Sequence, residues 1–155
     1  MPRRAHLLAA VLALLCIAAF FFSTLWVELF GSAAAVARLK ALIVMPGLLV
    51  LVPAIAVTGG SGAFLARGRK GRLVDTKLRR MPFIAANGLL VLVPCAVLLD
   101  RWAAAGSFDA AFYGLQALEL AAGAANLVLM GLNFRDGLRL SGRLGPAPRP
   151  AAGPR

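Results

Sequence analysis

The sequence has very few of the residues that form metal centres, disulfides or redox pairs. Its 155 residues include two cysteines and one histidine. Cys16 and Cys95 both lie in apolar runs and form no Cys-x-x-Cys motif, which indicates small packing residues and not a disulfide. A haem or zinc site needs more ligands than His6 alone can supply. We therefore expect neither a metal site nor a cofactor.

Acidic residues are also scarce. The chain has six Asp and Glu residues and 17 Lys and Arg residues, so its formal net charge is +11. In a soluble nucleic-acid-binding protein such an excess coats a folded surface. Here the basic residues cluster between apolar runs, a pattern typical of membrane topology. We expect the lipid bilayer as the main partner, and no nucleic acid.

Apolar residues are what the chain has in abundance. Hydrophobic residues make up 61% of it, charged residues only 15%, and the mean hydropathy is +0.83. This composition is too apolar for a soluble domain, and the chain is too short for several domains. We predict a single all-α membrane domain.

Four long apolar runs predict transmembrane helices at about residues 7–27, 41–66, 82–99 and 110–134. About 20 residues at ~1.5 Å each match a hydrocarbon core of ~30 Å. We predict an up-down bundle of four helices, with residues 28–40 as a connector. Residues 135–155 are basic and rich in Pro, Gly and Ala, and are expected to form a disordered cytoplasmic tail.

A cleaved signal peptide is the alternative for the first run, with a cleavage site at Ala33, Ala34 and Ala35. The apolar part of a signal peptide has roughly 7 to 15 residues. The run here is longer, which favours a retained helix.

The heptapeptide GLLVLVP occurs twice, at residues 47–53 and 88–94. The copies flank a basic segment, so they would cross the membrane in opposite directions, as in an inverted repeat. Chance recurrence in a Leu- and Val-rich chain is the alternative. Pro46, Pro53 and Pro94 predict helix bends, because a helical proline leaves the carbonyl four residues earlier without its donor. For the two copies, these carbonyls belong to Leu49 and Leu90.

The segment between the copies is the most basic part of the chain. Its cations are Arg67, Arg69, Lys70, Arg72, Lys77, Arg79 and Arg80. Cytoplasmic loops carry the excess of Lys and Arg, which places this segment in the cytoplasm. Contact with anionic lipid headgroups or with a partner is its alternative, functional interpretation.

The distribution of all 17 cations predicts the orientation. Only Arg38, Lys40 and Arg101 fall on the other side of the four-helix scheme. Both termini should therefore be cytoplasmic, in a multi-pass protein of a bacterial cytoplasmic (inner) membrane.

The fourth run carries polar residues on one helical face. Gln116, Glu119, Asn126 and Asn133 follow a spacing of three and four, which Gly123 and Met130 complete. This face must look into protein. Glu119 is the one carboxyl expected at membrane depth, and such a group is a functional candidate by default.

Counting the helical rise puts Glu119 and the carbonyls of Leu49 and Leu90 at about the same depth, about 12 to 15 Å below the outer edge. We hypothesise that Gln116 and a protonated Glu119 donate hydrogen bonds to these carbonyls. A dry site disfavours the charged carboxylate, and no cation is expected within range. The site could fix helix register, or serve as a proton or cation relay.

A second polar contact follows from the same depth count. Asn87 and Asn126 both fall about 6 Å from the inner boundary and could form a hydrogen bond across the third and fourth helices. Such bonds contribute about 0.6 to 2 kcal/mol in membrane bundles. This contact is expected to be structural.

These features favour a non-catalytic accessory, assembly or structural subunit, within a larger membrane complex or a homo-oligomer. It would dock through the basic segment and through a face of small residues on the fourth helix. These residues are Gly114, Ala117, Ala121, Ala124 and Gly131. The alternative is a small oligomeric transporter or channel that uses Glu119. An enzyme ranks third, since the sequence has no evident nucleophile–base pair.

Overall fold

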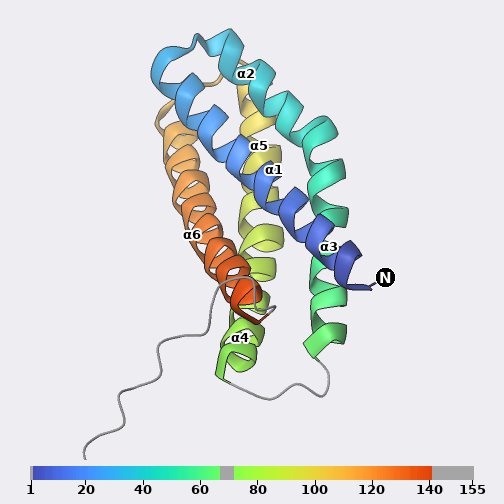
Figure 1. The fold of residues 1–155 in the computed structure, drawn as a ribbon. Helices are drawn as coiled ribbons and strands as arrows, with labels where there is room; N and C mark the ends of the chain where they lie inside the picture. Colours follow the sequence, from blue (N-terminus) through green and yellow to red (C-terminus); the bar gives the residue numbers. More distant parts are fainter. Residues whose placement is uncertain (1, 67–71, 141–155) are drawn as a thin grey trace, which may run out of the picture.

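The computed structural model describes residues 2–66 and 72–140 (Figure 1). The described chain forms α1 (Pro2–Phe30), α2 (Ala33–Leu42), α3 (Leu48–Ala66), α4 (Arg72–Asn87), α5 (Val93–Ala104) and α6 (Ala110–Leu140), with π-helical segments η1 (Ile43–Gly47) and η2 (Gly88–Leu92). The predictions made for Arg67, Arg69 and Lys70, and for most of the tail, lie outside the described residues.

Joined end to end, these segments make four long helical spans. Within the described residues they are Arg4–Phe30, Ala33–Leu65, Arg79–Ala104 and Ala110–Arg139, each long and apolar enough to cross a membrane. The predicted all-α fold with four apolar helices is confirmed. The spans run up and down in Figure 1, so the start of α1 and the end of α6 lie toward one end, here called the terminal end. The opposite end, with the bends at Gly31 and Gly106, is called the turn end.

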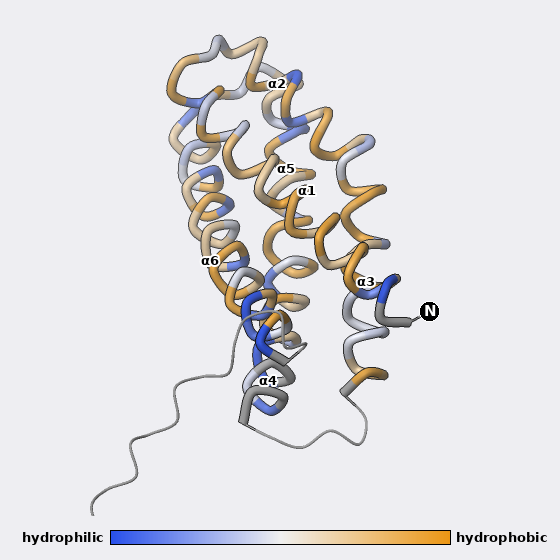
Figure 2. The backbone as a smooth tube through the Cα atoms, viewed as in Figure 1, coloured by the Kyte–Doolittle hydropathy of each residue, from blue (hydrophilic) through white to orange (hydrophobic). Residues whose placement is uncertain are grey.

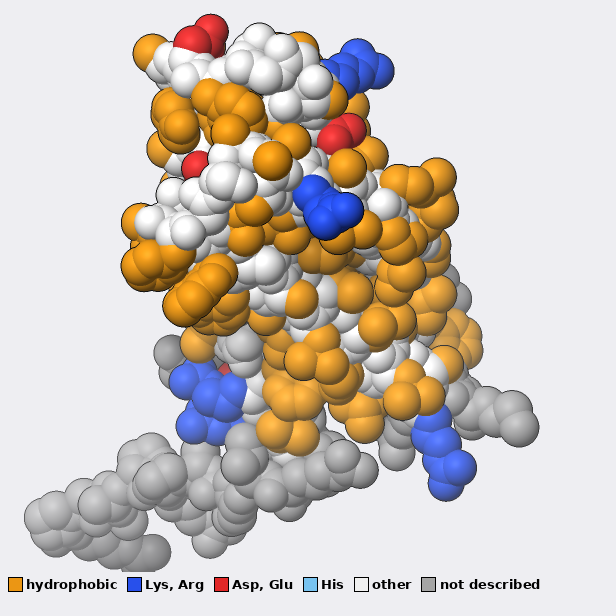
Figure 3. Space-filling view, turned by 90° about the horizontal axis from the view of Figure 1, so that it is seen from above, with side chains coloured by type: hydrophobic (Ala, Val, Ile, Leu, Met, Phe, Trp, Pro, Cys, Tyr) orange, Lys and Arg blue, Asp and Glu red, His pale blue; other side chains and the backbone are white. Residues whose placement is uncertain are grey.

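The outside of the bundle is apolar. Leu8, Phe83 and Leu90 are each more than 70% exposed, and Trp26 is 67% exposed. Figure 2 shows hydrophobic residues along all four spans, and Figure 3 shows hydrophobic side chains over much of the face in view. In water such exposure would be unfavourable, at about 25 cal/mol per Å². These surfaces suit a lipid environment.

The connection between the first two spans is much shorter than predicted. α1 ends at Phe30, and Ser32 already caps α2 by accepting a hydrogen bond from the Ala35 amide at 3.3 Å. The Ala-rich stretch that follows has high helix propensity. The predicted connector over residues 28–40 is therefore wrong for most of its length, and Arg38 and Lys40 lie in α2.

The helices at the terminal end also extend beyond their predicted limits. α4 begins at Arg72 and includes Lys77, Arg79 and Arg80, so the described part of the basic segment is helical and not a loop. α6 continues past residue 134 to Leu140. Hydropathy marks where a helix leaves the apolar layer, not where its backbone hydrogen bonding ends, and this explains the difference.

The three prolines predicted to bend helices have different local structures. Pro46 lies in η1, where Met45 departs from helical geometry (φ −137°, ψ 113°) and the Met45–Pro46 peptide bond is cis. Pro94 lies in the first turn of α5, directly after η2. Pro53 lies inside α3, which continues from Leu48 to Ala66 without a break. The two heptapeptide copies thus differ locally, since five residues of the second are π-helical and only Gly47 of the first is.

Two buried clusters form the core. One, toward the turn end, comprises Val36, Cys95, Leu99, Ala103 and Phe112 from α2, α5 and α6. The other comprises Ala13, Ile17, Leu51 and Ala54, at the contact between α1 and α3, which is the most extensive in the bundle. Small residues in both clusters let the helix backbones approach closely.

Candidate functional site

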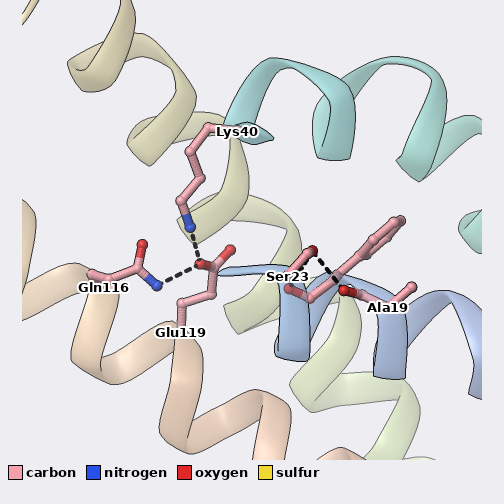
Figure 4. Close-up of polar contacts among 6 residues, drawn as sticks. Ala19, Ser23, Lys40, Gln116 and Glu119 are labelled. Atoms are coloured by element: carbon pink, nitrogen blue, oxygen red, sulfur yellow. Dashed lines mark hydrogen bonds and ion pairs between the residues drawn. The ribbon is translucent and has the colours of Figure 1, made fainter. Parts of the chain in front are cut away.

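A buried ion pair joins α2 to α6. Val36, Lys40 and Ile43 lie on the buried face of α2 and η1, and Lys40 is only 1% exposed. The Lys40 Nζ donates to Oε2 of Glu119 at 2.5 Å, and the Gln116 Nε2 donates to the same oxygen at 3.0 Å. Figure 4 shows the three side chains converging from two helices. Lys40 thus neutralises the Glu119 carboxylate inside the bundle.

This geometry corrects the hypothesis about Gln116 and Glu119. The hydrogen bonds of these two side chains, among the described residues, go to each other and to Lys40, and not to the carbonyls of Leu49 and Leu90. The expectation that no cation lies within range of Glu119 is also wrong. The reason is that residues 33–42 form a helix, which turns Lys40 toward the core instead of the membrane surface.

The sequence holds a signal for Lys40 that the hydropathy count overlooked. Val36, Lys40 and Ile43 are spaced by four and three residues, which is the spacing of one helical face. A lysine in phase with two β-branched apolar residues is on the core side of a helix. A long apolar stem lets it reach a carboxylate on a neighbouring helix.

Glu28 is a second carboxyl near this ion pair. It lies in the last turn of α1, is partly buried, and interacts electrostatically with both Lys40 and Glu119. Thr24, four residues earlier, is 3% exposed, so this face of α1 is turned inward. The sequence interpretation placed Glu28 at the exit of the first helix and gave it no role.

Two buried oxygen atoms near the pair have no hydrogen-bond partner among the described residues. Both bonds to the Glu119 carboxylate end on Oε2. The Oε1 atoms of Glu28 and Gln116 are buried and have no hydrogen-bond partner. In Figure 4 the Gln116 amide oxygen points away from the carboxylate to which its nitrogen donates. Buried acceptors of this kind are costly and are rare in folded proteins.

A cavity of about 60 Å³ lies beside the pair. Its lining comes from α1, η1, α3, η2, α5 and α6 and includes Ile17, Phe21, Leu51 and Leu92. Most of the lining side chains are apolar. Glu119 and Thr24 contribute polar groups to the cavity wall. A cavity of this size has room for water, which requires about 10 to 15 Å³ per molecule.

The predicted contact between Asn87 and Asn126 is present. The Asn87 Nδ2 donates to Asn126 Oδ1 and to the Ala122 carbonyl, both at 2.9 Å, and Asn126 is fully buried. The Asn126 Nδ2 donates to the Ile84 carbonyl at 3.4 Å. This network ties α4 to α6.

A further ion pair at the terminal end was not foreseen. The Arg80 Nη1 donates to Asp136 Oδ2 at 2.9 Å, and the Asp136 side chain is 3% exposed. Arg135 lies 3.5 Å from the other oxygen of the same carboxylate. Asn133, on the same face three residues earlier, is buried with its Oδ1 unpartnered. Because the predicted helix ended at residue 134, Asp136 was treated as part of the tail.

One Ser–His contact also comes from distant parts of the sequence. The His6 Nδ1 and the Ser61 Oγ are 2.9 Å apart, which joins the start of α1 to the end of α3. The Ser61 hydroxyl donates to the Val57 carbonyl of its own helix. Its proton is therefore not directed at the imidazole, as an activated nucleophile would require. The contact serves to connect two helices.

The small residues of α6 face outward. Gly114, Ala117, Ala121 and Gly131 are exposed, and a Cβ atom at either glycine would meet nothing within 4 Å. Ala124 is partly buried. Gly123 differs, since a Cβ there would lie 3.4 Å from Phe21 of α1. The described helices of this molecule thus leave most of the small-residue face uncovered.

Cys16 and Cys95 are both free thiols. Among residues 2–66 and 72–140, no group of three or more His, Cys, Asp or Glu side chains is placed to hold a metal ion. Comparison of the chain with family models, curated proteins and solved structures finds no match.

Proposed function

We propose that this chain is a non-catalytic accessory or assembly subunit of a membrane complex. The observation that supports this role is that three pairs of polar side chains inside the described bundle each join two different helices. The pairs are Lys40 with Glu119, Asn87 with Asn126, and Arg80 with Asp136. Groups bonded in this way stabilise a fixed helix arrangement and offer no free nucleophile or base.

The small-residue face of α6 is the surface proposed to bind the partner. In a bilayer, exposed glycine and alanine allow another helix to approach closely and to gain van der Waals contact. Ala117, Ala121 and Gly131 are exposed along α6, and no described helix packs on them. A transmembrane helix of the partner is the occupant that suits such a face.

The orientation is part of the same proposal. We place the terminal end in the cytoplasm of a bacterial cell, with both chain termini there. Its described cations include Arg79 and Arg80 on α4 and Arg135 and Arg139 on α6. Cations at this level would also contact anionic lipid headgroups.

Site-specific crosslinking tests the docking surface. A photoreactive residue at Ala121 on the small-residue face should crosslink to a discrete membrane protein in intact membranes. The matched control is Val57 on α3, which is also exposed but lies outside this face. We expect A121L to reduce co-purification of the crosslinked protein at least tenfold, and V57L to leave it unchanged. Equal crosslinking from both positions, or crosslinking to lipid alone, would contradict the proposal.

A small transporter or channel is the second candidate, and the cavity beside Glu119 is the observation that favours it. Such a protein would use the carboxylate to bind a proton or cation during transport. Purified protein in liposomes would then conduct protons, and E119Q would abolish the flux. Flux that is absent from the wild type, or unaffected by E119Q, would exclude this candidate.

A further inference from the structure

The turn end of the bundle contains one lysine and two carboxyl groups that interact with one another. Lys40 on α2 bonds Glu119 on α6, and Glu28 on α1 interacts electrostatically with both. If all three groups were ionised, the cluster would carry one uncompensated negative charge. Lys40 is 1% exposed and the Glu119 side chain 13%. An unpaired charge in such a place is strongly unfavourable.

Other charged groups of the surrounding helices do not compensate this charge. Arg38 of α2 and Arg101 of α5 are exposed, and Asp100 adds a further carboxyl on α5. Cys95 on α5 is a neutral thiol that interacts with Glu119 and Lys40. α3 has no Asp, Glu, Lys, Arg or His. The nearest ionisable groups of the described chain thus leave the cluster one positive charge short.

The hydrogen bonds of the cluster are also incomplete. Glu119 Oε2 accepts from Lys40 and from Gln116, whereas the Oε1 atoms of Glu28 and Gln116 are buried without a partner. Gln116 as a whole is only 3% exposed. A proton added to the cluster supplies one positive charge and turns one of these acceptors into a donor. One proton on the cluster therefore removes the excess negative charge and gives the protonated carboxyl a hydrogen-bond donor.

We propose that the cluster of Glu28, Lys40 and Glu119 binds one proton, which Glu28 carries while Lys40 pairs with Glu119. Hydronium at the turn end gives up the proton and becomes water as one of its O–H bonds breaks, and an O–H bond forms on the Glu28 carboxylate. On release this bond breaks, the proton returns to water, and the Lys40 ammonium is shared between two carboxylates. No electrons are transferred. This proposal depends only on the cluster, and its test is independent of the accessory role proposed above.

The position of Glu28 suits this exchange. It lies two residues before the end of α1 and is partly exposed, so water can reach it. Glu119 is deeper in the bundle and lines the cavity of about 60 Å³, which has room for water. The cluster thus extends from the turn end to this cavity.

The composition of the chain permits a direct test, because Glu28 and Glu119 are its only two glutamates. Glutamate labelled with ¹³C at the side-chain carboxyl gives two NMR signals in the full chain in lipid vesicles. At pH 7 we expect one protonated and one ionised carboxyl. In E28Q the remaining Glu119 should be ionised, and in E119Q the remaining Glu28 should be ionised, because each then has Lys40 to itself.

Replacing the lysine gives the opposite result. In K40M neither carboxylate has a counter-charge, so both signals should be of the protonated form at pH 7. The matched control is R38M, which removes an exposed cation two residues earlier on the same helix and should leave one signal of each kind.

The number of protonated carboxyls in the wild-type spectrum tests the proposal even if one variant fails to fold, and the signal lost in E28Q or E119Q assigns the two carboxyls. Two ionised carboxyls at pH 7 would overturn it. Two ionised carboxyls whose signals shift when sodium replaces choline would indicate a metal cation in place of the proton. A protonated Glu119 with an ionised Glu28 would also overturn it, since the proton would be on the wrong residue.

Discussion

Lys40 determines the charge balance at the turn end, because its ammonium group is buried against a carboxylate. Moving a lysine out of water carries a desolvation cost that only a close, hydrogen-bonded partner offsets. The 2.5 Å bond to Glu119 supplies that partner. The pair therefore connects α2 to α6, even where its net contribution to stability is small.

Removing one partner of the pair is expected to cost more than removing both. K40M leaves the buried Glu119 carboxyl without its counter-charge, and this loss should lower the free energy of unfolding by about 3 kcal/mol or more. In K40M/E119M no unpaired charge remains on α6, so the loss should be smaller than the sum of the single losses by at least about 1 kcal/mol. Unfolding in mixed micelles measures these values. Strictly additive losses would show that the two side chains do not interact.

At the scale of single residues, the sequence identified Gln116, Glu119, Asn87 and Asn126 as inward-facing. The contact between the two asparagines follows from helical depth alone, since both helices are regular where these residues lie. The partner of Glu119 did not follow, because it depends on a helix that the hydropathy count had treated as a connector. Asp136 was missed for a similar reason, since α6 is longer than its apolar run.

Among the helical elements, the joint between α2 and α3 is tightly packed around a glycine. Gly47 closes η1, and a Cβ atom there would lie 2.7 Å from the Phe20 ring and 3.0 Å from the Leu42 carbonyl oxygen. Gly59 in α3 has nothing within 4 Å of such a position. The two glycines therefore have different roles. Gly47 permits a close approach of helices, whereas Gly59 only loosens its own helix.

Alanine substitution should separate these roles. G47A forces the Phe20 ring and the backbone apart and should destabilise the protein by about 1 to 3 kcal/mol. G59A adds helix propensity without a clash and should stabilise it by about 0.5 to 1 kcal/mol. Thermal unfolding in detergent micelles would show opposite shifts. Equal shifts would mean that the approach of Phe20 to Gly47 is not needed for the fold.

The sequence predicted the existence and the order of the four spans but not their joints. Long apolar runs are a strong signal, because each must cover the thickness of a bilayer. The π-helical segments η1 and η2 leave no such signal. They depend on how a proline or a glycine is accommodated against neighbouring helices, as Gly88 is beside Asn126.

For the molecule as a whole, orientation in the membrane is the property that charge predicts most directly. The terminal end carries exposed cations such as Arg79 and Arg139, whereas Lys40 is neutralised inside the bundle. This burial removes one of the three cations assigned to the turn end. The excess of cations at the terminal end over the turn end is therefore larger than the sequence count indicates.

Thiol labelling of whole cells tests this orientation. In a background with Cys16 and Cys95 replaced by alanine, S107C at the turn end should react with a membrane-impermeant reagent. D75C, exposed on α4 at the terminal end, should react only after the membrane is permeabilised. The reverse pattern would place both termini outside. Labelling of both sites in intact cells would indicate two orientations.

By itself the sequence determined that this is a chain of four apolar helices with an inward polar face on the last one. Length and hydropathy are sums over many residues, so local errors do not change them. Only the tertiary structure decided that Lys40 pairs with Glu119 and that Glu28 is close enough to interact with both. Such contacts depend on the phase and tilt of helices that are far apart in the sequence, and small shifts in a joint decide which side chains meet.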